Sequence, residues 1–546
     1  MSQNQQKLTR TIGAAVLVVL GLAAYGAVAF NTLRNGRTNF EEVGYLIRSW
    51  WYTAGTVAPY TNADATWQMP LYFYLAGWWQ KLVGIGHHPV RILSAALGLV
   101  GAGFLFATCR RLTGNVLASA AGVLVFLATP ATAYAFSMAT PAALISTLHL
   151  AAIYIVVVSL GRPRIPLTIV FALICVTIFF TRQNLFPGFI ALCVLYLAAI
   201  GRQRRPHIAL LIGAIVFVTG LTLLDFPGGL AAQAARLPLL APSLSRWGVL
   251  PTDFGLIQSG TTGAATVLPE FASLQWTNLL DTLILPYAGL IVLAAAVFFV
   301  TGEALRILWI APLYFFGLII VHVLASASYC DGCMIGYVPY FAGVGALSAA
   351  LALATLASIA RQHEMKPGVI IVVGAIVGVA LSALGPTLAR NAAYRYFPAP
   401  QLVQPRPELE LDEVDMLSRW VKETLPVREP ILLIHANPAL PYAMFLGGAT
   451  FPVQSIDPDS TKRTIRPRVT GSAREIVQAA VEAQSLWTEE TQRRWLTRDY
   501  ELVLLAQAND KDQAATAATL NESFDVVATH PFRGQTLTLF RRKALQ

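Results

Sequence analysis

The sequence predicts a polytopic α-helical membrane protein of about eleven transmembrane helices, with a C-terminal α/β domain outside the membrane. Hydrophobic residues make up 55% of the 546 residues and charged residues only 12%, about half the fraction usual in soluble proteins. The first 400 residues hold 32 charged side chains, whereas the last 146 hold 36. We therefore expect a membrane part over 1–390 and a soluble domain over 391–546. Such hydrophobicity also excludes a disordered chain.

Apolar runs long enough to cross roughly 30 Å of hydrocarbon recur along the membrane part. They cover approximately 12–30, 90–109, 115–133, 139–160, 165–181, 185–200, 208–224, 279–300, 305–324, 336–358 and 368–388. Every second connector is basic, and these connectors contain Arg110 and Arg111, Arg162 and Arg164, Arg202, Arg204 and Arg205, Arg306, and Arg361 and Lys366. The positive-inside rule places them in the cytoplasm together with the N-terminus, so that an odd number of spans leaves the C-terminal domain outside. In a bacterium this is the periplasmic face of the inner membrane.

Two long external loops are expected, over 31–89 and 225–278. Segments 40–55 and 67–84 within the first loop are rich in tryptophan, which favours the membrane–water interface, and we predict helices that lie along the membrane surface. The alternative, a twelfth span near 70–84, would place the tail in the cytoplasm and conflicts with the basic connectors. The first span has an alternative interpretation as a cleaved signal peptide, since Ala27-Val28-Ala29 resembles a cleavage site.

The C-terminal domain has the pattern of a layered α/β fold. Alternating or β-branched apolar residues predict short strands, and helical periodicity predicts the segments between them. The expected strands are Ile431 to His435, Leu502 to Leu505, Asp525 to Ala528 and Thr536 to Phe540, and the expected helices are Glu413 to Leu425, 473–485 and 511–521. No glycine-rich phosphate loop is present, so a nucleotide site is not supported.

The pair Cys330 and Cys333 stands in a short predicted external loop. A local disulfide and two free thiols are about equally compatible with this spacing, and a single C-x-x-C lacks two of the ligands of a structural zinc site.

Adjacent carboxylates at Glu41 and Glu42 are the most suggestive polar groups, because ionisable side chains next to a membrane are costly. A structural explanation is equally available, since glutamate is favoured at a helix N-terminus. Comparable alternatives apply to the remaining polar candidates: Arg91 as an interfacial anchor, Arg182 as a snorkelling side chain, His87 and His88 as solvated loop residues, Asp64 as a turn residue, and Tyr337 as part of an aromatic belt.

Several short motifs resemble the superfamily of protein O-mannosyltransferases and lipid A aminoarabinose transferases, which are polytopic GT-C glycosyltransferases that use polyprenyl-phosphate sugars. The acidic pair follows the first span. A P-L-Y-x-Y-L helix and a span similar to R-x-L-S-A-L-x-G come after it. The motifs are Phe40 to Tyr45, Pro70 to Leu75, Arg91 to Gly98, Thr181 to Pro187 and Tyr337 to Ala342.

This resemblance implies a GT-C fold and the transfer of a sugar from a polyprenyl phosphate to an acceptor hydroxyl of an envelope glycan, lipid or protein. It implies Glu41 as the base and Glu42 as a group that orients the helix or the acceptor. Phosphate ligands would come from Arg182, Arg91, His87, His88 and Tyr337, and the substrate cavity would include Tyr45, Asp64, Gln68 and Tyr72. Inversion at the anomeric carbon is expected, no cofactor is firmly implied, and a divalent cation is compatible.

The chain departs from the family pattern at three places. Relatives usually begin the acidic pair with Asp where this chain has Glu41, and they commonly carry Lys-Pro-Pro where it has Gln68-Met69-Pro70. The segment 138–143 lacks the acidic residue that many relatives carry, which weakens a metal requirement.

Two other classes of function remain as alternatives: a transporter or flippase of lipid-linked substrates, and an envelope assembly partner. Transporters usually show internal repeats and polar groups at mid-membrane, which this sequence lacks. The membrane part also carries the whole positive net charge, which suggests contact with anionic lipid and not with nucleic acid.

Overall fold

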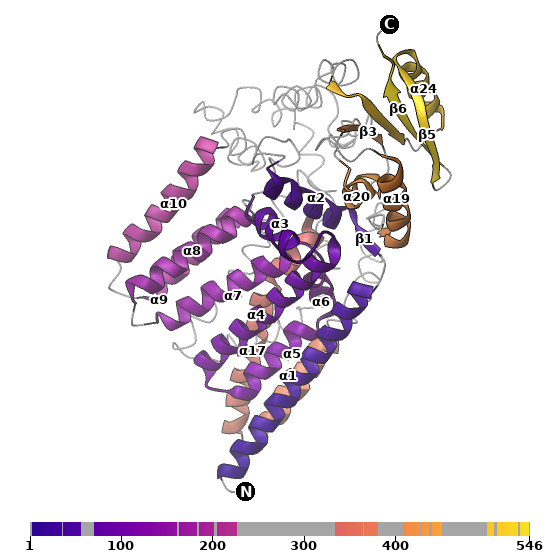
Figure 1. Ribbon diagram of the computed structural model, residues 1–546. Helices are drawn as coiled ribbons and strands as arrows, with labels where there is room; N and C mark the ends of the chain where they lie inside the picture. The colour runs from indigo at the N-terminus through magenta and orange to yellow at the C-terminus, as the bar shows by residue number, and fades with distance from the viewer. Residues whose placement is uncertain are drawn as a thin grey trace, which may run out of the picture.

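The computed structural model consists of a bundle of apolar helices with a small mixed sheet at one end (Figure 1). The structure describes residues 3–34, 37–55, 70–160, 163–182, 185–200, 205–225, 333–363, 365–380, 408–425, 429–435, 439–449, 499–506, 510–532 and 535–544. The expected spans 279–300 and 305–324, almost all of the loop 225–278 and the expected helix 473–485 lie outside these residues.

The bundle is built from helices that correspond closely to the expected spans. They are α1 (Gln3–Arg34), α4 (His87–Thr113), α5 (Val116–Ala128), α6 (Pro130–Phe136), α7 (Ala142–Val158), α8 (Ile165–Thr181), α9 (Phe186–Ala199), α10 (Arg205–Asp225), α17 (Cys333–Gln362) and Pro367–Ala380. Within the described residues, three helices are long and apolar enough to cross a membrane, namely Asn4–Arg34, His87–Thr113 and Ala342–Arg361, and six shorter apolar helices accompany them.

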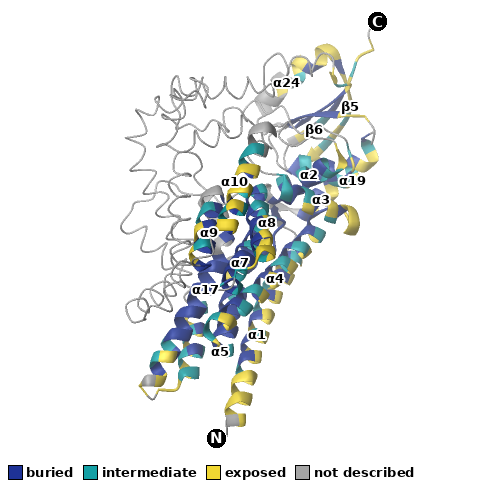
Figure 2. Ribbon diagram, turned by 90° about the vertical axis from the view of Figure 1, so that its left-hand side faces the viewer, coloured by how far each residue is buried: buried dark blue, intermediate teal, exposed yellow. Residues whose placement is uncertain are grey.

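The distribution of buried and exposed apolar side chains agrees with the expected contact between outer helices and lipid. The helix α17 is almost entirely enclosed by its neighbours, whereas α1 and α10 expose apolar side chains such as Val16, Leu20, Ile212 and Val216 (Figure 2). Exposed aliphatic surface of this kind suits hydrocarbon and not water. Inside the bundle, Gly122 of α5 permits close approach to α17, since a Cβ atom there would lie 2.6 Å from the Cβ of Ala350.

The expected span 115–133 is wrong as a single helix, and the reason is local. Helix α5 ends at Ala128 because Thr129 is extended (φ −69°, ψ 114°) before Pro130, and the residue that precedes proline disfavours the helical region. Helix α7 begins only after Pro141, three residues later than the expected start. Between α6 and α7 the backbone of 137–141 is therefore outside any helix.

The two expected surface helices are present as α2 (Phe40–Ala54) and α3 (Leu71–Val83), which lie across the upper end of the bundle in Figure 1. They cross at Gly77, where a Cβ atom would stand 2.0 Å from the carbonyl oxygen of Ser49. The amide of Gln80 donates to the carbonyl oxygen of Leu46 and its Oε1 accepts from the N–H of Gly86, so the same side chain ties α3 to both neighbours.

The C-terminal elements form a four-stranded sheet of order β3-β4-β6-β5, with β3 (Ile431–His435) parallel to β4 (Leu502–Ala506) and the other pairs antiparallel. The strands β5 (Phe524–Phe532) and β6 (Gln535–Arg542) are longer than expected. Three helices accompany them: α19 (Leu411–Thr424), α20 (Ala439–Leu446) and α24 (Asp510–Ser523). Alternate residues of β3 face two cores, since Leu432 and Ile434 pack with α24 while Ile431 and Leu433 pack toward the membrane part.

The sheet domain and the first loop lie at the same end of the bundle. Strand β1 (Arg37–Asn39) pairs antiparallel with β2 (Glu408–Glu410), with Thr38 opposite Leu409. One continuous hydrophobic cluster contains Leu46 of α2, Tyr72 of α3, Val414 of α19 and Leu440 of α20. The C-terminal sheet and its helices are therefore joined to the first loop and to α2 and α3 by backbone pairing and by a shared core.

The crossing at Gly77 gives a stability prediction. Gly77→Ala should destabilise the protein by about 1–3 kcal/mol, because the added methyl group overlaps the backbone of α2 and cannot be relieved by a side-chain rotation. Gly103→Ala on α4 is the matched control, since no atom lies within 4 Å of a Cβ there. Thermal unfolding in detergent should show a lower midpoint for the first variant only; equal midpoints would contradict this packing.

Candidate functional site

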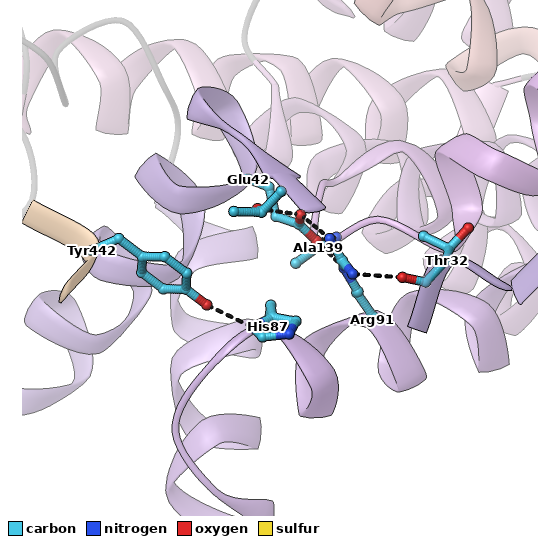
Figure 3. Close-up of polar contacts among 7 residues, drawn as sticks. Thr32, Glu42, His87, Arg91, Ala139 and Tyr442 are labelled. Atoms are coloured by element: carbon cyan, nitrogen blue, oxygen red, sulfur yellow. Dashed lines mark hydrogen bonds and ion pairs between the residues drawn. The ribbon is translucent and has the colours of Figure 1, made fainter. Parts of the chain in front are cut away.

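The acidic pair occupies the first turn of α2, a short distance beyond the end of α1. Of the hydrogen-bond partners of Glu42, Thr38 comes from the same loop, Arg91 from α4 and Ala139 from the α6–α7 connection (Figure 3). Glu41 is the second residue of α2, and its side chain lies outside the described set. The adjacent side chain of Glu42 is completely buried.

Both carboxylate oxygens of Glu42 accept hydrogen bonds. Its Oε1 accepts from Nε of Arg91 at 2.7 Å and from the backbone N–H of Ala139 at 2.7 Å. Its Oε2 accepts from Nη2 of Arg91 at 2.6 Å and from the hydroxyl of Thr38 at 2.6 Å. A buried carboxylate is tolerable only when its charge is paired and its lone pairs are satisfied, and both conditions hold here.

Arg91 is as deeply buried as its partner. The guanidinium makes a two-point ion pair with Glu42, and its Nη1 donates to the carbonyl oxygen of Thr32 at 2.7 Å. Five segments therefore meet at this pair: the end of α1, strand β1, the start of α2, the first turns of α4 and the α6–α7 connection. Arg91 was expected to bind a phosphate; here its side chain is completely buried, and its guanidinium donates to Glu42 and to Thr32.

Arg182 offers a different environment at the end of α8. The side chain is half-buried, and its N–H groups donate to the hydroxyls of Tyr340 at 3.1 Å and Tyr45 at 2.5 Å. Its charge also lies 5.8 Å from the ring centre of Tyr45 and 5.7 Å from that of Tyr340. The hydroxyls and rings of these two tyrosines thus hold the guanidinium in place.

Two expected cavity residues lie beside this cation. Tyr45 meets Tyr72 edge-on, with ring centres 5.5 Å apart, and both side chains are buried. Burial raises the pKa of Tyr72, so its hydroxyl stays protonated at any physiological pH. The hydroxyls of Tyr72 and of Ser94 are buried without a hydrogen bond of ordinary geometry. Ser94 belongs to the R-x-L-S motif but was not selected from the sequence.

The two histidines lie at the start of α4 and face the C-terminal domain. Nδ1 of His87 shares a hydrogen bond with the hydroxyl of Tyr442 at 2.8 Å, and the His88 ring lies 3.9 Å from the His87 ring between centres. His87 is therefore not a solvated loop residue. Tyr442 was missed because it stands 355 positions away in the chain and belongs to a helix, α20, that was not predicted.

The remaining candidates are outside what the structure describes. Asp64, Gln68 and Cys330 fall in undescribed segments, and Tyr337 and Cys333 lie in α17 with undescribed side chains. Among the described residues, no group of three or more His, Cys, Asp or Glu side chains is arranged to hold a metal ion.

A search of solved structures finds two crystal structures of ArnT from Cupriavidus metallidurans that match over almost the entire chain. The structure bound to undecaprenyl phosphate gives a TM-score of 0.55 at 16% identity and covers 96% of this chain and 97% of that one. The apo structure gives a TM-score of 0.52 at 15% identity, with 96% and 98% covered. Neither protein-family models nor curated proteins match the sequence. The expected resemblance to GT-C transferases is thus confirmed at the level of fold.

The ion pair yields a prediction on stability. Arg91→Gln or Glu42→Gln should destabilise the protein by about 3–5 kcal/mol, because each leaves a buried charge without its partner. The double variant Glu42→Gln/Arg91→Gln should lose less stability than the sum of the losses in the two single variants. The control is Arg541→Gln, which breaks an exposed 3.4 Å pair with Glu429 and should change stability by under about 1 kcal/mol. Additive effects in a double-mutant cycle of thermal midpoints would contradict the coupling.

Proposed function

We propose that the protein is an integral-membrane glycosyltransferase that moves a sugar from a polyprenyl phosphate to a hydroxyl acceptor. The observation that carries the proposal is the agreement in fold with ArnT from end to end, combined with an acidic pair fixed at the end of the bundle that carries the sheet domain. The acceptor classes are an envelope glycan, a lipid or a protein.

The reaction is proposed on the external, periplasmic face. Helix α4 begins at His87, beneath the sheet domain, and its 27 residues end beyond Arg110 and Arg111. At 1.5 Å per residue the two ends are about 40 Å apart, so these arginines lie at the opposite membrane face. The positive-inside rule assigns that face to the cytoplasm and the site to the outside. This location suits a lipid donor whose tail remains in hydrocarbon while its phosphosugar lies at the surface.

The adjacent glutamates divide two tasks in this proposal. Glu42 is committed to Arg91 and holds the start of α2 against α4. Glu41 is the base: its carboxylate takes the proton of the acceptor hydroxyl as the oxygen bonds to the anomeric carbon. The bond between that carbon and the phosphate oxygen breaks at the same time, and the polyprenyl phosphate leaves with the electron pair. Direct displacement of this kind inverts the anomeric configuration.

Arg182 supplies the positive charge for the departing phosphate. The leaving group gains negative charge as the bond breaks, and a preorganised donor in a partly dry site stabilises that charge without reorganisation. The hydroxyls of Tyr45 and Tyr340 accept hydrogen bonds from the guanidinium and keep it in place. A planar guanidinium also matches the geometry of phosphate oxygens.

The role of Glu41 is tested by an isosteric change. In proteoliposomes supplied with polyprenyl-phosphate sugars and envelope acceptors, Glu41→Gln should lower kcat by about 10²–10⁴-fold, because the amide cannot accept the proton. The fold should persist, with an unchanged melting midpoint. Asp412→Asn, at an exposed carboxylate of α19, is the control and should retain full activity. Sugar transfer by Glu41→Gln at the wild-type rate would remove this residue from the mechanism.

A second variant tests the phosphate site. Arg182→Gln should weaken use of the lipid donor, lowering kcat/KM by about 10- to 100-fold, since a charged hydrogen bond to phosphate is lost. Arg34→Gln removes an exposed cation at the same end of the bundle and should have little effect. Donor titrations with a radiolabelled sugar measure kcat/KM for both variants. An equal loss of kcat/KM in Arg182→Gln and Arg34→Gln would indicate a general attraction of the anionic lipid and contradict a specific phosphate site.

A further inference from the structure

Helix α20 of the C-terminal domain places one tyrosine directly against the membrane part. Tyr442 is completely buried, and its hydroxyl lies 2.8 Å from Nδ1 of His87 at the start of α4 (Figure 3). The two rings meet edge-on with centres 6.2 Å apart. This is a hydrogen bond between domains, formed where both partners are withdrawn from water.

The position of Tyr442 is fixed by its own neighbours. Its ring stacks with Phe445 one turn later in α20, at 6.3 Å between centres, and Phe445 in turn meets Trp50 of α2 edge-on at 6.3 Å. The pairing of β1 with β2 holds the domain to the same loop. Helix α20 therefore contacts both α4 and α2, the two helices that carry the Glu42–Arg91 pair.

The hydroxyl of Tyr442 stays protonated, because burial raises its pKa. When this O–H donates to Nδ1 of His87, the imidazole proton resides on Nε2. Nε2 itself is buried without a hydrogen-bond partner in the described part of the chain. The charged and titratable groups that act on His87 are His88 and Arg91, both on α4.

The His87 ring lies between Tyr442 and the Glu42–Arg91 pair in Figure 3. A buried N–H without an acceptor is unfavourable, because the group has lost its hydrogen bonds to water. An anionic oxygen would supply the missing acceptor. A phosphate of a lipid-linked donor at the end of the bundle provides such an oxygen.

We propose that Tyr442 is a positioning residue for sugar transfer: it holds His87 in one orientation and tautomer, so that Nε2–H donates to the phosphate of the lipid-linked donor. This inference rests on the proposed function and extends it, because it makes the C-terminal domain a part of the site. Tyr442 acts through His87.

The test combines variants on both sides of the hydrogen bond. Tyr442→Phe removes only the hydroxyl and should lower kcat about tenfold with a smaller change in the KM for the lipid donor, because a donor to the leaving phosphate is worth most in the transition state. His87→Gln places an amide N–H near the position of Nε2, whereas His87→Asn places one near Nδ1. We expect His87→Gln to retain more activity than His87→Asn.

The decisive measurement is the double variant. In the His87→Gln background, Tyr442→Phe should cause no further loss of kcat, since the orientation of a glutamine amide does not depend on a proton at Nδ1. Tyr500→Phe, in the same domain but packed on the opposite face of the sheet, is the control for removal of a partly buried hydroxyl. Melting midpoints report folding; if Tyr442→Phe fails to fold, the contrast between His87→Gln and His87→Asn tests the same proposal.

Two outcomes separate the inference from the proposed function. An active wild type whose Tyr442→Phe variant retains kcat, or loses as much in the His87→Gln background as alone, overturns the positioning role and leaves the transferase intact. A wild type that transfers no sugar from any polyprenyl phosphate tested overturns the proposed function, and the positioning role with it.

Discussion

The buried ion pair between Glu42 and Arg91 is the interaction on which the upper end of this protein depends. Removing two charges from water is unfavourable, and their attraction offsets that cost only with good geometry and additional hydrogen bonds. Here Thr38 and Ala139 donate additional hydrogen bonds to the carboxylate, and the carbonyl oxygen of Thr32 accepts one from the guanidinium. Because these partners come from segments far apart in the sequence, one charged contact fixes how the first span, the interfacial helices and α4 meet.

That constraint commits one of two adjacent glutamates to the structure. Glu42 is completely buried and paired with Arg91, and Glu41 precedes it as the second residue of α2. A carboxylate that serves as a base needs a defined position and a proton acceptor that is not already paired. Rigid anchoring of one residue can supply the position for its neighbour. Arg91 and Arg182 also have different surroundings: Arg91 forms an ion pair with Glu42, and Arg182 donates hydrogen bonds to the hydroxyls of two tyrosines.

The C-terminal sheet and its helices pack directly against the helix bundle. Its core residues share one hydrophobic cluster with α2 and α3, and its first strand pairs with β1. Interfacial helices alone would present an apolar face to water. The sheet domain covers that face with Leu440 and Phe445, and the burial of aromatic rings across this contact contributes much of its stability. A domain held in this way is suited to a role in the site.

Local composition and hydrophobic periodicity were sufficient to predict most of the individual helices and strands of the described residues. It predicted the apolar helices of the described bundle, the strand Ile431–His435, the surface helices and the resemblance of the short motifs, because hydrophobicity and turn residues act over a few positions. Pro130 signalled the break after α5, although the span length obscured it. Only the tertiary structure decided that Arg91 pairs with Glu42 and that Tyr442 reaches His87. Partners so distant in the chain leave no periodic signal, since their meeting follows from how all the helices pack.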